Sequence, residues 1–447
     1  MEESTPQKKI KILTISDHPL SPSGVGTQTK YFIIELLKTG KFQFVSLCGA
    51  MKHQNYEPQK TEEFKDDWVM YPIDGYGNAE IIRSVLRSHK PDVLWFMTDP
   101  RFFPWLWEIE NEVRSLVPMV YYHVWDNYPY PNFNKVWYES TDVIATISKV
   151  TSDIVKTVAP TVEEHYVPHA TPSDLFKPQD DLQIRNFRKQ HFGIEDDNHM
   201  LIFWNNRNAR RKQSGSLIYW FDTFRKKLQK KHKGANATLL MHTTANDPNG
   251  QDLFAIISEL GLNNKEVLIS ETKIPPDALV AIYNAADCTI NIADAEGFGL
   301  ATFESLACGT PIITTMTGGL QEQVTFIENI TQDKMLARNK KNKSVTEYEH
   351  GIGLEPSSKA IIGSQQVPFI YEDRLQEKQV VDGLMMMYEF GKEKRKELGN
   401  TGREHVEKNY NFESFAKTWE KIITDTYEKH GSWDTRKNYK GWELRAI

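Results

Sequence analysis

The sequence has little of what marks secreted, membrane-spanning or nucleic-acid-binding proteins. It holds 3 cysteines in 447 residues, far apart, which argues against a disulfide framework and against a zinc site. No apolar run reaches the ~18–20 residues of a membrane span. The polar stretch Met1–Lys11 lacks the apolar core of a signal peptide, and a net charge of -6 disfavours a dedicated nucleic-acid binder. We therefore expect a cytoplasmic globular protein.

Aromatic residues, by contrast, are numerous for so polar a chain. The sequence has 11 Trp, 18 Tyr and 22 Phe, while 26% of its residues are charged and 39% are hydrophobic. Such a composition is typical of a folded globular protein rather than a disordered one. The length predicts two or three domains, each large enough to bury a core.

The first part of the chain alternates predicted strands and helices. An alternating apolar segment, 9–16, runs into a Pro/Ser/Gly loop at 19–26, and a segment with helical periodicity follows at 27–38. Strand, glycine loop and helix form the first unit of a Rossmann-type α/β domain. Short apolar runs typical of buried parallel strands follow at Phe42–Leu47, Asp92–Phe96, Met119–Val124, Val143–Ile147 and a run ending at Val167.

A turn-rich stretch, Thr171–Asp181, reads as an interdomain linker, after which the alternation starts again. We therefore predict two doubly wound domains, 1–175 and 182–410, that face a cleft at the carboxyl ends of their sheets, where such folds bind ligands. The strands of the second domain are expected at Met200–Trp204, Ala237–His242, Val267–Ile269, Cys288–Ile292 and Pro311–Thr315, and its helices at Gly215–Lys231, Asp252–Leu260, Pro276–Ala285 and Leu300–Cys308.

The most informative motif follows the predicted strand that starts at Cys288. A glycine-rich turn, Gly297-Phe298-Gly299, precedes a helix that begins near Leu300. The free N–H groups of that helix form an anion site, which the glycines leave open to a phosphate. Carboxylates flank it at Glu296 and Glu304, and they could accept hydrogen bonds from sugar hydroxyls. The motif indicates a nucleotide-sugar site; the alternative is an ordinary turn with two solvated acids.

A basic loop, Arg207-Asn-Ala-Arg-Arg-Lys212, follows the predicted strand Met200–Trp204. Its cations could hold a pyrophosphate and stabilise charge on a leaving group. The alternative is a solvated basic loop.

Together these motifs resemble those of retaining GT-B glycosyltransferases of group 1. Glu296-x7-Glu304, with the run up to Glu322, resembles the family signature, and Arg207-x4-Lys212 resembles its "G-R-x4-K-G", with Asn206 and Gln213 in place of the glycines. The resemblance implies the GT-B fold, in which the final helix, about 410–447 here, crosses back onto the first domain. It also implies donor-binding residues, namely Gly24, Gly26, Arg207, Lys212, Glu271, Glu296, Gly297, Phe298, Gly299, Leu300 and Glu304.

The same resemblance implies an acceptor side in the first domain. His123 ends a predicted strand where the family has a histidine beside the transferred sugar, and Asp126 lies in the same region. The alternative for His123 is a structural role. The aromatic residues Trp125, Tyr128 and Tyr130 follow the same strand end and would suit stacking on an acceptor. Side-chain identity does not show which nucleobase the segment around Glu271 would bind, although uridine is the commonest in the family.

The family resemblance implies transfer of a sugar, with retention of configuration, from a nucleotide-sugar to a hydroxyl acceptor, and the expected nucleotide is UDP. The catalytic residues would be His123, Arg207, Lys212 and Glu296. No metal or other cofactor is expected, since the protein supplies the cations and the sequence has no Asp-x-Asp motif. The alternatives are a GT-B nucleotide-sugar epimerase, a non-catalytic nucleotide-sugar-binding module and a nucleic-acid glucosyltransferase.

Two basic stretches, 225–233 and 334–343, keep the last alternative open. Charge runs like these are usually solvated faces. They could instead contact an anionic membrane surface, so a soluble protein and a peripheral one on the inner membrane face are both compatible with the sequence. The segment 328–366 matches no motif of the family, and we expect it to form an excursion at the edge of the cleft.

Overall fold

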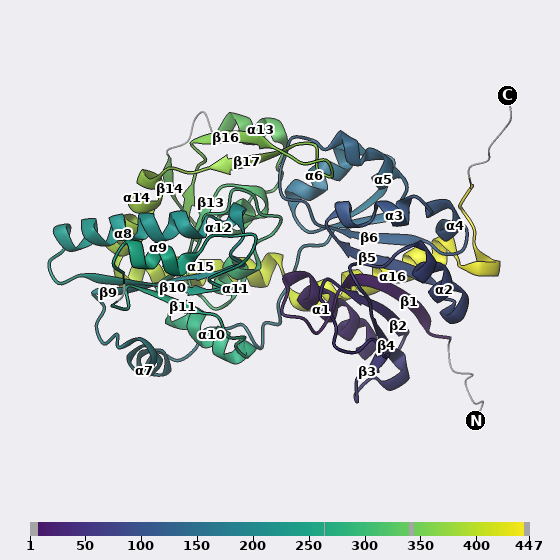
Figure 1. Cartoon of the computed structure of the whole chain (residues 1–447), viewed down its shortest axis with the longest axis horizontal. Helices are drawn as coiled ribbons and strands as arrows, with labels where there is room; N and C mark the ends of the chain where they lie inside the picture. The colour runs from purple at the N-terminus through teal and green to yellow at the C-terminus, as the bar shows by residue number, and fades with distance from the viewer. Residues whose placement is uncertain (1–7, 263, 339–343, 442–447) are drawn as a thin grey trace.

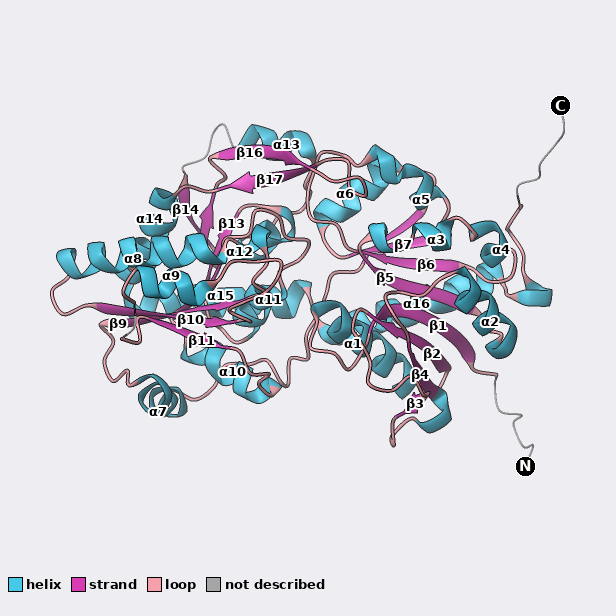
Figure 2. Cartoon of the chain, viewed as in Figure 1, coloured by secondary structure: helices cyan, strands magenta, loops and turns pink. Residues whose placement is uncertain are grey.

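The computed structural model describes residues 8–262, 264–338 and 344–441. They form two α/β domains, each a layer of strands with helices on both sides (Figure 2). Among these residues the first sheet has the order β3-β4-β2-β1-β5-β6-β7-β8, and it is parallel apart from the β3–β4 pair. Its strands are β1 (Ile10–Asp17), β2 (Phe42–Gly49), β3 (Gln59–Lys60), β4 (Trp68–Pro72), β5 (Val93–Thr98), β6 (Met119–His123), β7 (Val143–Thr146) and β8 (Glu163–Tyr166).

Helices cover both faces of the first sheet. The predicted helix at 27–38 is α1, which begins earlier, at Gly24, where the Ser23 side chain accepts a hydrogen bond from the Gly26 N–H. The helices of this domain are α1 (Gly24–Lys38), α2 (Ala79–His89), α3 (Pro104–Trp107), α4 (Glu110–Arg114), α5 (Lys135–Glu139) and α6 (Lys149–Val158).

The second sheet has the order β11-β10-β9-β12-β13-β15-β14 within the described residues. It is parallel apart from the β14–β15 pair, and a separate antiparallel hairpin, β16–β17, follows it. The strands are β9 (His199–Asn205), β10 (Asn236–His242), β11 (Val267–Ser270), β12 (Cys288–Asn291), β13 (Ile312–Thr315), β14 (Val345–Tyr348), β15 (Gly351–Leu354), β16 (Ser358–Ile362) and β17 (Ile370–Arg374).

The helices of the second domain begin after the linker, at Asp181. They are α7 (Asp181–Phe192), α8 (Ser214–Lys231), α9 (Leu253–Glu259), α10 (Pro276–Ala285), α11 (Leu300–Ala307), α12 (Gln321–Val324), α13 (Gln332–Arg338), α14 (Glu377–Glu389) and α15 (Gly391–Asn409). The segment 328–366, expected to form an excursion, contains α13, β14, β15 and β16. The expectation is wrong for β14 and β15, which extend the second sheet beside β13. Part of the basic stretch at 334–343, residues 339–343, lies outside the described residues.

The last helix, α16 (Phe412–His430), returns to the first domain, as the yellow segment in Figure 1 shows. Its Trp419 is fully buried and packs edge-on against Phe32, Trp95 and Tyr122. Burial of such aromatic surface is the main favourable contribution to the packing of α16 on the first domain. The crossing of the final helix is therefore confirmed, and many of the aromatic residues belong to this core.

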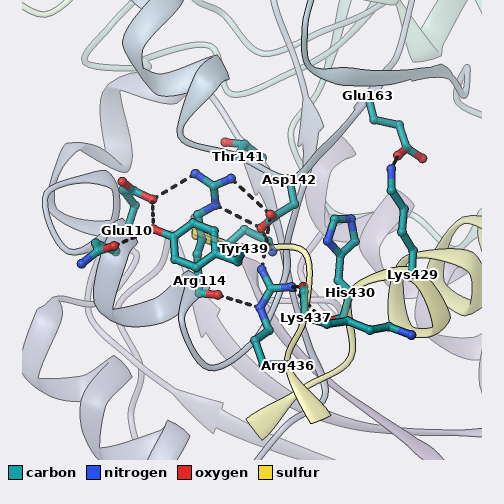
Figure 3. Close-up of polar contacts among 12 residues, drawn as sticks. Glu110, Arg114, Thr141, Asp142, Glu163, Lys429, His430, Arg436, Lys437 and Tyr439 are labelled. Atoms are coloured by element: carbon teal, nitrogen blue, oxygen red, sulfur yellow. Dashed lines mark hydrogen bonds and ion pairs between the residues drawn. The ribbon is translucent and has the colours of Figure 1, made fainter. Parts of the chain in front are cut away.

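The segment after α16 is tied to the first domain by a polar network (Figure 3). The Asp142 carboxylate accepts hydrogen bonds from Arg114, at 3.2 Å to each oxygen, and lies 3.4 Å from an Arg436 nitrogen. Arg436 also donates to the backbone carbonyls of Arg114 and His430, at 2.7 and 3.0 Å. The carboxylate is almost fully buried, so its two guanidinium partners compensate for its lost hydration.

None of the described helices is long and apolar enough to cross a membrane. The three cysteines are free and buried.

Candidate functional site

The strand order of each sheet indicates where a ligand can bind. In an open α/β sheet, ligands lie beyond the carboxyl ends of the two strands at which the order reverses. These strands are β1 and β5 in the first sheet, and β9 and β12 in the second. The loop after β1 leads to Gly24 and Gly26 at the start of α1, the loop after β9 is the basic loop 207–213, and the loop after β12 carries the glycine-rich motif.

The glycine-rich turn is held in shape by its neighbours. Gly299 has φ +92, in the left-handed region that favours glycine, and an added Cβ would lie 2.4 Å from Leu320 Cδ2. The Gln323 side-chain amide donates to the carbonyls of Phe298 and Gly299, at 2.7 and 3.2 Å. The turn therefore leads directly into α11, where the first N–H groups have no partner within the helix.

Phe298 does not face this anion site with its side chain. It is buried, with its ring 5.0 Å from His169 and 5.2 Å from Phe303 between centroids. Only its backbone is positioned for a ligand.

Lys212 and Glu296 meet at the junction of the two loops. The Lys212 ammonium is in direct contact with Glu296 Oε2, and both residues are buried. Asn291 Nδ2 lies 3.4 Å from the same carboxylate oxygen. Burial and the neighbouring Arg211 guanidinium lower the pKa of Lys212 well below its ordinary value, while Asp126 opposes this. The structure thus brings one cation and one carboxylate of the predicted site together.

The rest of the basic loop has other partners. Arg207 is 64% exposed and donates to Asp247 through two nitrogens, at 2.7 and 3.1 Å, rather than to the Lys212–Glu296 pair. Gln213 has φ +56 and so takes a left-handed conformation without a glycine, at a cost of about 1–2 kcal/mol. Its side chain donates to Asp294 Oδ2 at 2.7 Å. The basic loop therefore turns at Gln213, where the family pattern has a glycine, and its backbone is somewhat strained there.

The second glutamate of the motif, Glu304, lies about one helical turn after the start of α11. Glu304 Oε2 accepts a hydrogen bond from the Tyr283 hydroxyl at 2.8 Å, and that hydroxyl accepts one from Asn205 Nδ2 at 2.9 Å. Burial raises the pKa of Glu304 to about 7, and the Tyr283 hydroxyl opposes the shift. Glu271, in contrast, is exposed and accepts from the Ala245 N–H at 2.8 Å.

The first domain meets this site through the start of α1. A Cβ added to Gly24 would lie 2.9 Å from Leu300 Cδ1, so the amino-terminal ends of α1 and α11 adjoin across the domain boundary. Ser23, which caps α1, donates to Asp17 Oδ2 at 2.6 Å. The two predicted glycine loops therefore lie side by side.

His123 is fully enclosed in the first domain. Its Nε2 lies 2.7 Å from the Tyr138 hydroxyl, and burial lowers its pKa to about 3, so the imidazole is neutral. His123 is fully buried and Tyr138 covers it, so the expected contact with a sugar requires rearrangement of these neighbours and stays a prediction.

The aromatic acceptor surface expected at Trp125 and Tyr128 is not present in this structure. Both residues are buried. Trp125 Nε1 donates to the Asn127 carbonyl at 2.8 Å, and the Tyr128 hydroxyl donates to Asp153 Oδ2 at 2.7 Å. Tyr130 donates to the same oxygen at 2.9 Å. The loop folds its rings inward because these polar atoms find partners on α6 and within the loop itself.

Asp126 reaches the domain boundary, where Arg211 Nε lies 3.6 Å from its Oδ2. The sequence interpretation missed Tyr283, Asn127 and the acidic residues of β17 as part of this region. No pattern marked any of them, since Ile370-Tyr-Glu-Asp-Arg374 places two apolar residues before three charged ones and lacks the alternation of a strand. Among the described residues, no group of three or more His, Cys, Asp or Glu side chains could hold a metal ion; a metal-independent reaction stays a prediction.

Comparison with known proteins agrees with this geometry. Residues 187–339 match the family "Glycosyl transferases group 1". A D-inositol 3-phosphate glycosyltransferase of Acidothermus cellulolyticus is 42% identical over 72 residues, 16% of this chain and 16% of that protein. One from Corynebacterium jeikeium is 50% identical over 46 residues, 10% of this chain and 11% of that protein. The matched stretches are thus a small part of these relatives.

Solved structures show the likeness along nearly the whole chain. Sucrose-phosphate synthase of Thermosynechococcus elongatus has a TM-score of 0.68 at 15% identity, covering 94% of this chain and all (100%) of that one. Anabaena HepE, in complex with UDP and glucose, has a TM-score of 0.63 at 13% identity, covering 93% and 99%. The chain therefore has the GT-B fold. Within that fold, the match to the glycosyl transferases group 1 family covers residues 187–339, a part of the second domain.

Proposed function

We propose that the protein is a retaining glycosyltransferase that moves a sugar from a nucleotide-sugar, UDP-linked, to a hydroxyl acceptor. The observation that carries the proposal is the buried Lys212–Glu296 contact beside the amino-terminal end of α11. A cation, free helix N–H groups and a carboxylate at one point suit a ligand that carries both phosphates and hydroxyls. The UDP in the HepE structure supports the choice of nucleotide.

Each group has a distinct task in this proposal. The diphosphate binds at the start of α11, where the helix N–H groups and Lys212 hold its charge. Glu296 accepts hydrogen bonds from the transferred sugar, and Glu304, held by Tyr283, accepts them from the ribose. The Lys212–Glu296 contact exchanges for contacts with the donor when it binds.

The reaction proceeds on one face of the sugar. The acceptor hydroxyl attacks the anomeric carbon from the side on which the diphosphate leaves, and the leaving phosphate oxygen takes the acceptor proton. The bond from the anomeric carbon to the phosphate oxygen breaks as the new glycosidic bond forms, so the configuration is retained. Lys212 and the helix N–H groups stabilise the negative charge that develops on the leaving group.

The basic stretch on α8 gives little support to a nucleic-acid or membrane partner. Lys226 and Arg225 both pair with Asp222, at 2.6 and 3.1 Å, and Lys227 pairs with Asp382 at 2.8 Å. Lys231 pairs with Glu389 at 2.5 Å. Charges neutralised in this way attract a polyanion weakly. A cytoplasmic location is part of the proposal.

The test is release of UDP from a panel of UDP-sugars, with and without candidate hydroxyl acceptors. Acceptor-dependent release with an α-linked product from an α-linked donor supports the proposal. A changed sugar still attached to UDP, without any acceptor, would instead identify an epimerase. Binding of UDP-sugars without turnover, across donors and acceptors, would identify a binding module.

A further inference from the structure

Strand β17 contacts the first domain directly, although it belongs to the second. The Tyr371 N–H donates to the Tyr128 carbonyl at 2.7 Å, and Asn127 Nδ2 donates to Asp373 Oδ2 at 3.0 Å. Just before the strand, the Phe369 ring packs edge-on against Phe133, with 4.9 Å between centroids. The hairpin and α13 lie on the side of the second domain that faces α6 (Figure 1).

The same strand also holds the basic loop of the candidate site. Arg210 donates to both carboxylate oxygens of Glu372, at 3.0 and 2.5 Å. Arg374 lies 3.3 Å from Asp294 Oδ2, which also accepts from Gln213 at the end of the loop. The Asp373 N–H donates to the Asp294 carbonyl at 2.7 Å.

Strand geometry explains how the five residues of β17 can contact the first domain and the basic loop at the same time. Successive side chains of a strand point to opposite faces. The Asp373 side chain faces Asn127 of the first domain, whereas Glu372 and Arg374 face the basic loop and Asp294. Tyr371 contacts the first domain through its backbone N–H. A shift of β17 therefore moves both sets of contacts together.

The buried carboxylates of β17 make its contacts sensitive to the separation of the two domains. Asp373 is fully buried and Glu372 is 2% exposed. Besides Asn127, Asp373 has the Lys359 ammonium, directly across the hairpin, as a partner. A buried carboxylate is stable only while such partners hold it. Separation of the domains at this point takes Asn127 away from Asp373.

We propose that β17 couples closure of the two domains to the order of the basic loop. When the domains close, Asn127 binds Asp373, β17 is fixed, and Glu372 then fixes Arg210 and with it the loop that carries Lys212. Asn127 and Asp373 are positioning residues, since in this proposal they act on the loop through Glu372. The coupling rests on the proposed function only in taking 207–213 as the loop that binds the diphosphate.

Hydrogen exchange of the whole protein without ligand tests the coupling. The loop has protected reporters, for example the Arg210 N–H, which donates to the Asn249 carbonyl at 2.9 Å. Asn127→Asp keeps the local bond from the Tyr128 N–H to the side-chain oxygen but sets two carboxylates against each other. We expect exchange in 207–213 to rise about tenfold or more in this variant. Unchanged exchange in 207–213, with faster exchange only in 125–130, would overturn the coupling.

The double variant Asn127→Asp with Asp373→Asn provides a rescue. It restores one carboxylate facing one amide, with the donor and acceptor reversed, and exchange in 207–213 should return toward that of the wild type. Failure of the rescue in a folded double variant counts against the coupling. Ile361→Thr, at a position 66% exposed on the same hairpin, is the control and should leave both loops unchanged.

Two further measurements keep the result unambiguous. If Asn127→Asp does not fold, Asn127→Ala removes the donor to Asp373 without adding a charge, and unchanged exchange in 207–213 then overturns the coupling. Titration with UDP separates this inference from the proposed function. Wild-type protein that does not bind UDP contradicts the function and leaves the exchange result standing, whereas weaker UDP binding in Asn127→Asp that recovers in the double variant supports both.

Discussion

Lys212 and Glu296 are 84 residues apart in the sequence, yet the ammonium and the carboxylate are in direct contact inside the protein. They meet because β9 and β12 are neighbours in the sheet, so the loops after these strands leave the same edge side by side. A buried ion pair of this kind is costly to break from one side, since the remaining charge loses its partner without regaining water. Such a pair is stable without a ligand and can be exchanged for contacts with one.

Replacement of Lys212 by Ala should lower kcat by about 10²–10³-fold, because one preorganised donor to the leaving group is lost. The variant also leaves the Glu296 carboxylate buried and unpaired, which should reduce the free energy of unfolding by about 3–5 kcal/mol. UDP release and urea unfolding measure the two effects. Full activity in Lys212→Ala would contradict the proposed role.

A matched double variant separates the two effects of Lys212→Ala. Lys212→Met with Glu296→Gln removes both charges and nearly keeps the volumes, so stability should largely recover. Activity should stay low, since neither the cation nor the carboxylate is present. Recovery of activity together with stability would mean that Lys212 matters only for folding.

The hydroxyl of Tyr283 should matter for donor binding. Tyr283→Phe removes the bond to Glu304, and the KM for the donor should rise about tenfold, the effect of one lost hydrogen bond. The hydroxyl also stabilises the ionised form of Glu304, so its loss should raise the pKa of that carboxyl further above about 7. We therefore expect the pH profile of kcat/KM to shift to higher pH. Tyr219→Phe, at a residue 46% exposed on α8, should change neither quantity.

The alternation of strands and helices could be predicted because buried parallel strands are short apolar runs separated by helical periodicity. The helix Pro276–Ala285 agrees in both bounds, and Ala237–His242 differs from β10 by one residue. The hairpin β16–β17 could not be predicted in this way. Its positions are partly exposed, as Ile361 shows, so no apolar period marks them. Its conformation depends instead on contacts with Asn127 and Arg210, far away in the sequence.

Within the candidate site, the residue types and their loops could be read from the sequence, whereas their partners could not. The positions of Lys212 and Glu296 follow from their motifs, but Arg207 pairs with Asp247, about forty residues further on, which no local pattern reveals. The position of His123 at a strand end was also predictable. Its burial was not, because it depends on Tyr138 in the next helix, α5, folding over it.

Trp419 should be essential for attachment of α16 to the first domain. It is fully buried against Phe32, Trp95 and Tyr122, so Trp419→Ala should reduce the free energy of unfolding by about 3–5 kcal/mol. Urea unfolding followed by circular dichroism measures this. Leu182→Ala, at a residue 66% exposed on α7, is the control and should change it by less than about 0.5 kcal/mol. Equal effects at the two positions would contradict the assignment of Trp419 to the core.

Stability should depend on pH through Glu322, which links the domains. Its carboxylate accepts from the Lys149 N–H at 2.6 Å and from the Tyr166 hydroxyl at 3.0 Å. Burial raises its pKa to about 7, above the ordinary value of 4.5. Between these values the folded protein keeps a proton that the unfolded chain has released, so the free energy of unfolding falls as the pH rises. The slope contributed by Glu322 is at most about 1.4 kcal/mol per pH unit.

A difference between variants isolates this contribution, because His405 acts in the opposite sense. Burial and His350 lower the pKa of His405 to about 4, so its contribution to stability rises with pH up to its ordinary value of 6.5. We expect the advantage of wild type over Glu322→Gln to shrink from pH 5 to pH 7 and then level off. Glu328→Gln, at an exposed position nearby, should show no such trend. A constant difference between wild type and Glu322→Gln across this range would mean that the carboxyl group ionises normally in the folded protein.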